Sequence, residues 1–211
     1  MPPEVWIGAD GKRLAASLSI VAQARGLVIF AHGSGSSRHS ARNVFVAEQL
    51  NRRGFSTLLL DLLTPSEDRV DRVTAELRFD VALLARRVER ASAWAETEPR
   101  SQSLPQGYFG ASTGAAAALV AASMRPSVRA VVSRGGRPDL AGAALPRVQA
   151  ATLLLVGGND PVVLQLNQEA QQRMRAVCEL VVIPGAGHLF EEAGELEAVA
   201  KHAGEWFERH V

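Results

Sequence analysis

The feature that most constrains the fold of this 211-residue chain is the pentapeptide Gly110-Ala111-Ser112-Thr113-Gly114. It follows the short apolar run Tyr108-Phe109 and leads into an alanine-rich stretch that ends at Leu119-Val120. A G-x-S-x-G pattern between a strand and a helix is typical of a sharp, strained turn that lifts a serine hydroxyl out of the sheet edge. Residues without a Cβ fit both flanks of such a turn at low cost. Ser112 is therefore the candidate nucleophile.

The rest of the chain alternates between short apolar runs and stretches with helical spacing. Strands are predicted over residues 5–8, 13–21, 27–31, 56–63, 128–133, 152–156 and 180–183, besides the run before Ser112. Helices are predicted over 43–53, 77–94, from the pentapeptide to about 126, over 167–177, and at the C-terminus. Asp10-Gly11 favours a hairpin turn between the first two strands. The charge-rich segment 64–76 is expected to be a surface segment or small flap, so the lid is minimal.

This alternation predicts the fold class. Strands that alternate with helices form a mostly parallel central sheet with helices on both faces, here with an N-terminal antiparallel hairpin. The chain shows no composition break, linker or repeat. We therefore expect a single α/β domain over residues 1–211.

Two loops carry candidate partners for the serine. In such sheets, reactive groups collect beyond the carboxyl ends of the strands. Asp160 follows the strand predicted at 152–156, and His188 follows the last strand. The chain order Ser112, Asp160, His188 is the order of the α/β-hydrolase triad. In that triad the histidine takes the serine proton, while the acid fixes the histidine tautomer.

Other residues compete for the acid's role, or serve the oxyanion. Asp139 lies one strand earlier and ranks second, while Glu191 and Glu192 are too near His188 in sequence to reach round it comfortably. The oxyanion hole needs two N–H donors. We expect one from the residue after the nucleophile, Thr113, and one from the loop after the strand at 27–31. In that loop Ser34 is favoured over Gly33, and His32 is expected to brace the loop.

The motifs together resemble a known family, the small cytosolic α/β-hydrolases of the dienelactone-hydrolase-like type. The resemblance runs from about Leu27 to the C-terminus and implies the α/β-hydrolase fold. Dienelactone hydrolases themselves carry a cysteine in the elbow, so Ser112 favours an ordinary serine esterase. Some relatives of this type are fused to a phosphoribosyltransferase domain, for which this chain has no room. The motifs that carry the resemblance are residues 30–35, 110–114, 158–160 and 186–188.

A glycine-rich loop with two arginines, Ser133-Arg134-Gly135-Gly136-Arg137, ends the strand before the acid's strand. Arg134 and Arg137 are candidate substrate-binding residues, since guanidinium groups bind carboxylate or phosphate in bidentate fashion. Arg38 and Arg42 could add to the same positive field. Alternatively, these arginines are solvated loop charges or partners of Asp139 and Asp160.

Composition limits the partners. Twenty-three Lys and Arg against 22 Asp and Glu give a net charge of +1, so we expect neither nucleic-acid nor membrane binding. The one cysteine, Cys178, and the lack of a signal-peptide pattern indicate a cytoplasmic protein. No histidine or cysteine spacing suggests a metal, and the triad chemistry needs no cofactor.

The sequence thus predicts a serine hydrolase that cleaves a small carboxylic ester or lactone through an acyl-enzyme. Two alternatives remain open. The same triad could transfer an acyl or thioester group to an acceptor other than water, or the fold could be a non-catalytic binding module. The sequence leaves the substrate undetermined, and it leaves a homodimer open.

Overall fold

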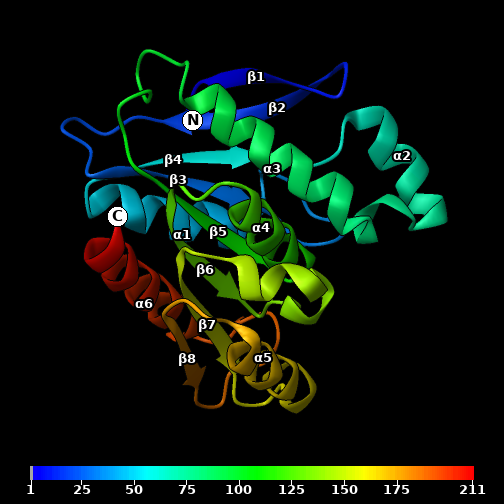
Figure 1. The fold of residues 1–211 in the computed structure, drawn as a ribbon, viewed down its shortest axis with the longest axis vertical. Coiled ribbons are helices and arrows are strands. Elements are labelled where there is room, and N and C mark those ends of the chain that lie inside the picture. Colours follow the sequence, from blue (N-terminus) through cyan, green and yellow to red (C-terminus); the bar gives the residue numbers. More distant parts are fainter. Residues whose placement is uncertain (1) are drawn as a thin grey trace.

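The structure, a computed structural model, describes residues 2–211 and is built on one eight-stranded sheet (Figure 1). The strand order is β1-β2-β4-β3-β5-β6-β7-β8. β1 and β2 pair antiparallel, as do β2 and β4, and every other pair is parallel. The strands are β1 (Glu4–Ala9), β2 (Lys12–Ser19), β3 (Gly26–Ala31), β4 (Phe55–Leu60), β5 (Gln106–Ala111), β6 (Val128–Arg134), β7 (Ala151–Gly157) and β8 (Cys178–Ile183).

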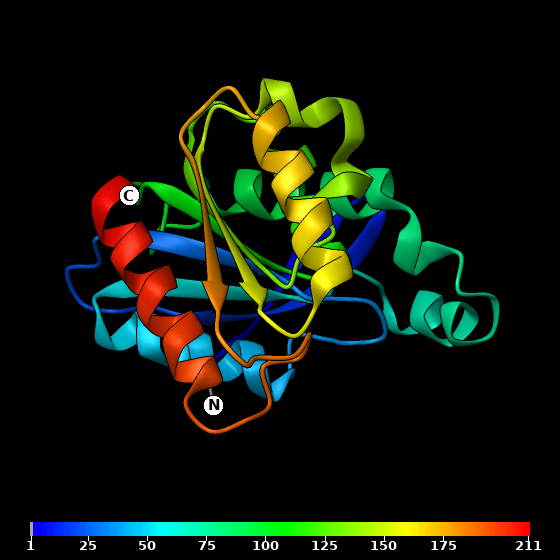
Figure 2. The same ribbon diagram turned by 90° about the horizontal axis from the view of Figure 1, so that it is seen from below.

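Helices cover both faces of this sheet (Figures 1 and 2). α1 and α6 lie on one face, and α3, α4 and α5 lie on the other, while α2 projects from one end of the molecule (Figure 1). The predicted α/β-hydrolase architecture is therefore confirmed. The helices are α1 (Ala41–Arg52), α2 (Pro65–Thr74), α3 (Val81–Ala95), α4 (Thr113–Met124), α5 (Pro161–Arg173) and α6 (Glu195–His210).

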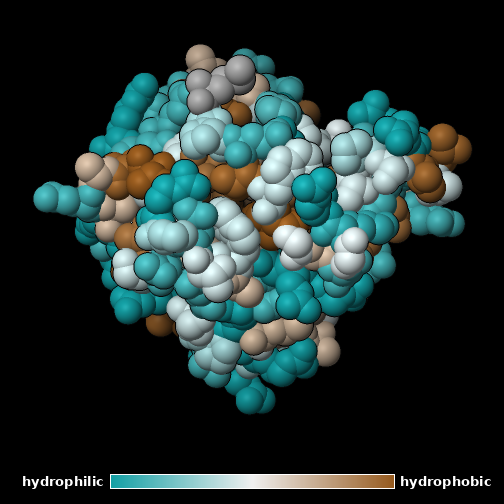
Figure 3. All heavy atoms as spheres, turned by 90° about the horizontal axis from the view of Figure 1, so that it is seen from above, coloured by the Kyte–Doolittle hydropathy of each residue, from teal (hydrophilic) through white to brown (hydrophobic). Residues whose placement is uncertain are grey.

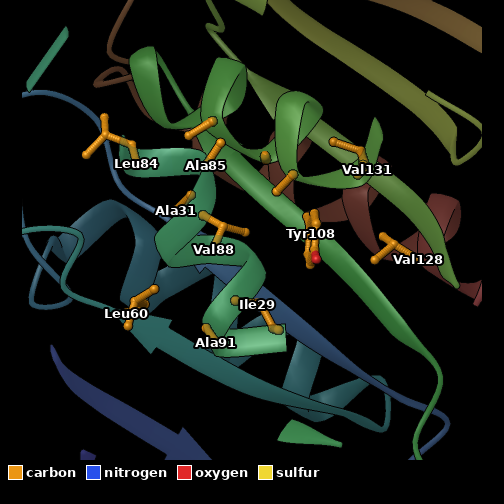
Figure 4. Close-up of a cluster of buried hydrophobic side chains, with 14 of the residues drawn as sticks. Ile29, Ala31, Leu60, Leu84, Ala85, Val88, Ala91, Tyr108, Val128 and Val131 are labelled. Atoms are coloured by element: carbon orange, nitrogen blue, oxygen red, sulfur yellow. The ribbon is translucent and has the colours of Figure 1, made fainter. Parts of the chain in front are cut away.

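The sheet separates two hydrophobic cores. Its central strands β3, β4 and β5 are buried along their whole length, as expected for strands covered on both faces. Side chains of one parity, such as Ile29, Tyr108 and Val131, pack against α3 and α4 (Figure 4). Side chains of the other parity, such as Phe109 and Val132, pack with residues of α1 and α6. The β3–β5–β6 region is thereby fixed from both sides, and the elbow lies at its carboxyl end.

The N-terminal hairpin forms as predicted. Asp10 and Gly11 both have positive φ, at 51° and 72°, which is the geometry of a type I′ turn. The turn joins β1 to β2, and Ala9 pairs with Lys12 directly across it.

The sequence did not predict one helix, and it placed the starts of two others wrongly. Residues 65–74 lie at the surface as expected, but they form a regular helix, α2, begun by a capping box in which the Thr64 hydroxyl accepts from Glu67 N and the Glu67 carboxylate accepts from Thr64 N. α3 begins at Val81, capped by Asp80, after a separate 3₁₀ turn. α5 begins at Pro161 rather than at 167, because Asp160 is its N-cap.

A fourth difference is a 3₁₀ segment, Pro138–Arg147, where the sequence pattern suggested only a turn around Asp139. This segment packs against α4 and α5. It is kinked at Gly142, whose φ is 49°. Asp139 thus belongs to a helical layer beside α4 and α5.

The molecular surface carries a few exposed apolar side chains. Hydrophobic atoms stand out at the end of the molecule formed by α2 (Figure 3), where Val70 and Val73 are exposed. Within residues 2–211, every helix is too short or too polar to cross a bilayer.

Candidate active site

Ser112 lies at a turn that only a tightly packed site maintains. β5 ends at Ala111 and α4 begins at Thr113, so a single residue connects strand to helix. That residue has φ 50° and ψ −120°, a backbone conformation that side-chain-bearing residues rarely adopt. Backbone strain of this kind persists only where the surroundings over-determine it.

The two glycines of the pentapeptide explain why the turn can form. A Cβ at Gly110 would lie 2.4 Å from Ala115 Cα, and one at Gly114 would lie 2.3 Å from the carbonyl oxygens of Ala31 and His32. Both distances are too short for a side chain. The two glycines of the G-x-S-x-G pattern therefore allow strand β5, helix α4 and the loop after β3 to pack closely around Ser112.

Backbone hydrogen bonds fix the serine from the β6 side. Ser112 N–H donates to the Arg134 carbonyl at 3.2 Å, and Arg137 N–H donates to the Ser112 carbonyl at 3.2 Å. The loop Arg134-Gly135-Gly136-Arg137 thus holds the strained residue by both of its backbone polar groups.

Asp160 and His188 are in contact. His188 Nδ1 lies 2.7 Å from Asp160 Oδ2. The other carboxylate oxygen, Oδ1, accepts from Val163 N at 3.4 Å and so caps α5. Asp160 therefore has two roles, since it caps α5 and also contacts the predicted base, His188.

The loops that carry these two residues are joined by their own hydrogen bonds. Asn159 N–H donates to the Ala186 carbonyl at 2.9 Å, and its side-chain amide donates to the Gly185 carbonyl at 2.6 Å. A Cβ at Gly157 would lie 2.3 Å from the Ala186 oxygen, so the two loops touch. The Asp160–His188 pair is held by this contact rather than by the two side chains alone.

The His188 ring also lies beside the loop that holds Ser112. A Cβ at Gly135 would lie 3.6 Å from His188 Cε1 and 3.0 Å from the His188 carbonyl oxygen. Gly135 N–H donates to the Leu155 carbonyl. Gly135 directly follows Arg134, whose carbonyl accepts from Ser112 N–H. The structure thereby brings the loops of all three predicted residues to one edge of the sheet.

The loop after β3 approaches the elbow from the opposite side. A Cβ at Gly33 would lie 3.2 Å from Ser112 Cβ, and Ser34 Oγ lies 2.9 Å from Thr113 Oγ1. Thr113 is the first residue of α4, so its N–H has no acceptor within the helix. The segments proposed to supply two oxyanion donors are therefore adjacent to each other.

His32 braces this loop, as the sequence suggested. Its Nε2 accepts from Leu62 N–H at 3.0 Å, which leaves Nδ1–H to donate to the Gly33 carbonyl at 2.9 Å. Burial lowers the pKa of His32, in agreement with a neutral ring that bridges β3 and the chain just after β4.

The rival acids lie elsewhere. The Asp139 carboxylate accepts from both Nε and Nη2 of Arg137, at 2.9 and 2.8 Å. Glu191 pairs with Arg42. Among residues 2–211, Asp160 is the carboxylate that hydrogen-bonds to His188. The same contacts show that Arg137 is already occupied by a carboxylate of its own chain.

Arg134 has a different environment, which the sequence did not reveal. It is the last residue of β6 rather than a loop residue, and it is only 8% exposed. Its Nε and Nη1 atoms are buried, and neither has a hydrogen-bond partner within the described chain, residues 2–211. Arg38, by contrast, pairs with Asp61 and Glu4.

A small hollow adjoins the oxyanion segments. It is lined by the loop after β3, by Thr113, and by Leu62, Leu63 and Arg78 from the region around α2, and its volume is about 20 Å³. The α2 region thus forms the modest cover over one side of the site, in keeping with a minimal lid.

The fold and the elbow together define the class of α/β-hydrolases. A model of the alpha/beta hydrolase family matches residues 10–201. The chain therefore belongs to that family. It is similar to a dienelactone hydrolase from Anabaena variabilis, known from its crystal structure, with 52% identity and a TM-score of 0.97. The match covers 100% of this chain and 99% of the other, so this chain is a dienelactone-hydrolase-like member of the α/β-hydrolase family.

Two further comparisons concern a second solved structure and a longer curated relative. Est1E from Butyrivibrio proteoclasticus shares the fold, with 18% identity, a TM-score of 0.80 and 98% of each chain covered. A protein of Mycobacterium tuberculosis strain H37Rv named "Putative phosphoribosyl transferase" is 57% identical over 209 residues, which is 99% of this chain. The match covers 46% of that protein, so this chain spans less than half the length of the curated relatives it matches.

Proposed function

We propose that this protein is a serine hydrolase that cleaves a small carboxylic ester or lactone through an acyl-enzyme. The observation that carries the proposal is the 2.7 Å contact between His188 Nδ1 and Asp160 Oδ2, beside a strained elbow serine. The carboxylate accepts a hydrogen bond from Nδ1–H, so the proton stays on Nδ1 and Nε2 is left with a lone pair to act as the base.

The reaction follows from these roles. Ser112 Oγ attacks the substrate carbonyl carbon while its proton passes to His188 Nε2, and the carbonyl oxygen becomes an oxyanion. The intermediate collapses as the C–O bond to the alcohol breaks, and the alcohol leaves with the proton from Nε2. A water molecule then repeats the sequence on the acyl-enzyme and releases the acid and the free serine.

The oxyanion would accept hydrogen bonds from the N–H groups of Thr113 and Ser34. The first lies at the N-terminus of α4, where the helix dipole favours negative charge. The contact between the Ser34 and Thr113 hydroxyls supports this pairing, because it fixes the two segments relative to each other. Losing one such donor typically costs about 10²–10³ in kcat.

The small cover over the site supports a short acyl group. The segment between β4 and α3 contributes only α2 and a short 3₁₀ turn, so no large cap domain encloses a long chain. We infer a water acceptor rather than an alcohol or thiol, since nothing in the described site is specific to a second substrate. A cytoplasmic location is also part of this proposal, and it rests on the single cysteine.

The experiment is hydrolysis of 4-nitrophenyl acetate and butyrate, a short lactone and a thioester by the wild type, Ser112→Ala and Ser123→Ala. Ser123 lies on α4, the helix that follows Ser112, and its hydroxyl donates to the Val120 carbonyl. Ser123→Ala therefore controls for the loss of a serine hydroxyl. We expect kcat/KM to fall about 10⁴-fold or more for Ser112→Ala alone, with unchanged circular dichroism. Turnover by Ser112→Ala close to that of the wild type would refute the proposal.

A further inference from the structure

Asn167 is a fully buried amide on α5, the helix that Asp160 caps. Its Nδ2 donates to the Val163 carbonyl at 2.8 Å and to the Gly136 carbonyl at 3.0 Å. The first bond stays within the helix, where an α-helix already pairs that carbonyl with the Asn167 N–H. The second bond leaves α5, which lies on the same face of the sheet as α4 (Figure 1), and reaches the loop after β6. Asn167 therefore joins α5 to the Arg134-Gly135-Gly136-Arg137 loop.

This amide carries a cost that an apolar side chain would avoid. Asn167 Oδ1 is buried and, within residues 2–211, accepts no hydrogen bond. An unpaired buried oxygen disfavours the folded state, whereas leucine has nearly the same size and no polar atom. Among those same residues, Asn167 is also the group that donates to the Gly136 carbonyl. The bond to Gly136 is thus the contribution that explains an amide at this position.

The loop that receives this bond has no side chains at its centre. Gly135 and Gly136 are glycines, which have more backbone freedom than other residues, and Gly135 uses it, with φ at 50°. A Cβ at Gly136 would overlap the Ser133 hydroxyl and would lie 2.8 Å from Ala115 Cβ. These contacts limit the loop toward β6 and α4, and the hydrogen bond from Asn167 fixes it toward α5.

The same loop holds the backbone of Ser112. The Arg134 carbonyl accepts from Ser112 N–H, and Arg137 N–H donates to the Ser112 carbonyl, both at 3.2 Å. The two bonds flank the glycine pair, so a movement of Gly136 passes directly to the Arg137 N–H. Ser112 keeps its φ of 50° and ψ of −120° only while its surroundings enforce them. A loosened loop should therefore displace the Ser112 hydroxyl.

We propose that Asn167 is a positioning residue for the nucleophile, because through Gly136 it fixes the loop that keeps Ser112 in its strained conformation. This inference rests on the proposed function and adds to that site a residue outside the triad. Asp160 caps the first turn of α5 and Asn167 bonds from the second, so one helix sets the place of both the acid and the nucleophile. Asn167 acts through the loop rather than on the substrate. Its loss should therefore slow the attack by Ser112 without weakening substrate binding.

Asn167→Leu tests this role, because leucine fills the same space without a donor. The matched control is Asn51→Leu. Asn51 lies on α1, and its Nδ2 also donates two hydrogen bonds, to the Phe55 carbonyl at 2.8 Å and to Thr57 Oγ1 at 3.0 Å. Phe55 pairs with Gly26 at the start of β3, so this amide lies at the end of the sheet away from the elbow.

Two more variants complete the set. Gln171→Leu removes a side-chain bond of the same helix, from Gln171 Nε2 to the Cys178 carbonyl at 2.9 Å, and leaves the loop untouched. Asn167→Ala leaves space for a water molecule, which can bond to the Gly136 carbonyl but cannot hold the loop in one place. The alanine variant should therefore be more stable than the leucine variant, and it replaces Asn167→Leu in every measurement if the leucine variant does not fold.

The first measurement is the pre-steady-state release of 4-nitrophenol from 4-nitrophenyl acetate, which reports the acylation of Ser112. We expect the acylation rate constant to fall about 10–100-fold in Asn167→Leu, while the ester concentration that gives half the maximal rate stays within about twofold. Asn51→Leu and Gln171→Leu should acylate within about twofold of the wild type, even where their melting temperatures fall by as much. Wild-type acylation in both Asn167 variants, or an equal loss in Asn51→Leu, would overturn the inference.

Hydrogen exchange at single amides, measured by NMR, separates local loosening of the loop from a loss of global stability. The exchange rates of the Ser112 and Arg137 amides are divided by that of Leu154, a fully buried residue of β7 whose exchange reports global unfolding. We expect these ratios to rise at least about tenfold in Asn167→Leu and to stay unchanged in Asn51→Leu.

The two measurements distinguish this inference from the proposed reaction. If the wild type hydrolyses no ester but the exchange ratios rise in Asn167→Leu, the proposed function fails and the anchoring of Ser112 by Asn167 stands. If the wild type acylates, and Asn167→Leu changes neither the acylation rate constant nor the exchange ratios, the inference fails alone.

Discussion

Replacing Asp160 by asparagine separates the two jobs of that residue. Its Oδ1 caps α5 by accepting from Val163 N, and its Oδ2 contacts His188 Nδ1 at 2.7 Å. Asparagine is as good an N-cap as aspartate, so Asp160→Asn should change the free energy of unfolding by no more than about 0.5 kcal/mol. It removes the negative charge that holds the histidine tautomer. We therefore expect kcat to fall about 10⁴-fold with little change in stability.

Alanine at the same position gives the comparison. Asp160→Ala removes both the cap and the carboxylate, which should cost about 1 kcal/mol of stability. For a chain of this length that corresponds to a melting temperature lower by about 2–4 °C. Thermal unfolding and 4-nitrophenyl acetate hydrolysis, measured on the same preparations, report the two effects separately.

The control for Asp160→Asn is Asp139→Asn. It removes a carboxylate shortly after the neighbouring strand β6, where Asp139 pairs with Arg137 rather than with His188. Asp139→Asn should leave kcat within about twofold of the wild type, because surface ion pairs contribute little. A large kcat loss in Asp139→Asn together with a small one in Asp160→Asn would refute the reasoning and move the acid to Asp139.

Three further predictions follow from other parts of the structure. Gly114→Ala forces a Cβ to within 2.3 Å of two carbonyl oxygens, so it should abolish activity and lower the free energy of unfolding by about 1–3 kcal/mol. The control is Gly8→Ala, where the space around the Cβ is open and urea unfolding should be unchanged. Burial alone would raise the pKa of Glu67, but its contacts with the buried Arg87, with Lys12 and with Thr64 hold that pKa well below 4.5. The contribution of Glu67 to the free energy of unfolding is therefore complete above the pKa of its carboxyl group in the unfolded chain, and it is lost as the pH falls below about 4.5. Glu67→Gln should cost about 3–5 kcal/mol of that free energy at pH 7, and it should make the free energy of unfolding depend less on pH in acid. An equal acid slope in both proteins would contradict this. Burial raises the pKa of Cys178 to about 12, so iodoacetamide at pH 8 should leave ester hydrolysis intact, and rapid inactivation would show that a thiol takes part.

Much of this architecture could be predicted from the sequence because its signals are local. Continuous apolar runs such as Leu27–Ala31 predict strands that are covered on both faces, and β3 is buried throughout. Asp10-Gly11 predicts the hairpin through backbone conformation alone. The elbow is recognisable because two glycines at fixed spacing around Ser112 reflect a close contact that admits no Cβ.

The sequence did not predict α2 or the start of α5, although both helices have a local capping signal. The segment after Thr64 is rich in charges, which hides a complete capping box with Pro65 at the first helical position and Glu67 at the third. The start of α5 is predicted too late when Asp160 is considered as an acid and not as the N-cap that starts a helix. Both signals are readable from the sequence once capping is considered first.

The difference between the two arginines could not be predicted. Arg134 and Arg137 lie three residues apart with glycines between them, and their sequence contexts suggest the same role. Packing decides otherwise, because β6 extends one residue further than expected and places Arg134 in the buried layer. Arg137 instead reaches Asp139 in a 3₁₀ segment that the sequence pattern did not reveal.

The most direct test of the account is covalent labelling with a fluorophosphonate, read by intact mass and peptide mapping. The reagent phosphonylates a serine only where a base and an oxyanion hole activate it. We predict one adduct per chain, located on Ser112, with no adduct in Ser112→Ala and labelling slowed at least about a hundredfold in Asp160→Asn. An unlabelled wild type, or an adduct on another residue that persists in Ser112→Ala, would contradict the central claim that Ser112 is the activated nucleophile.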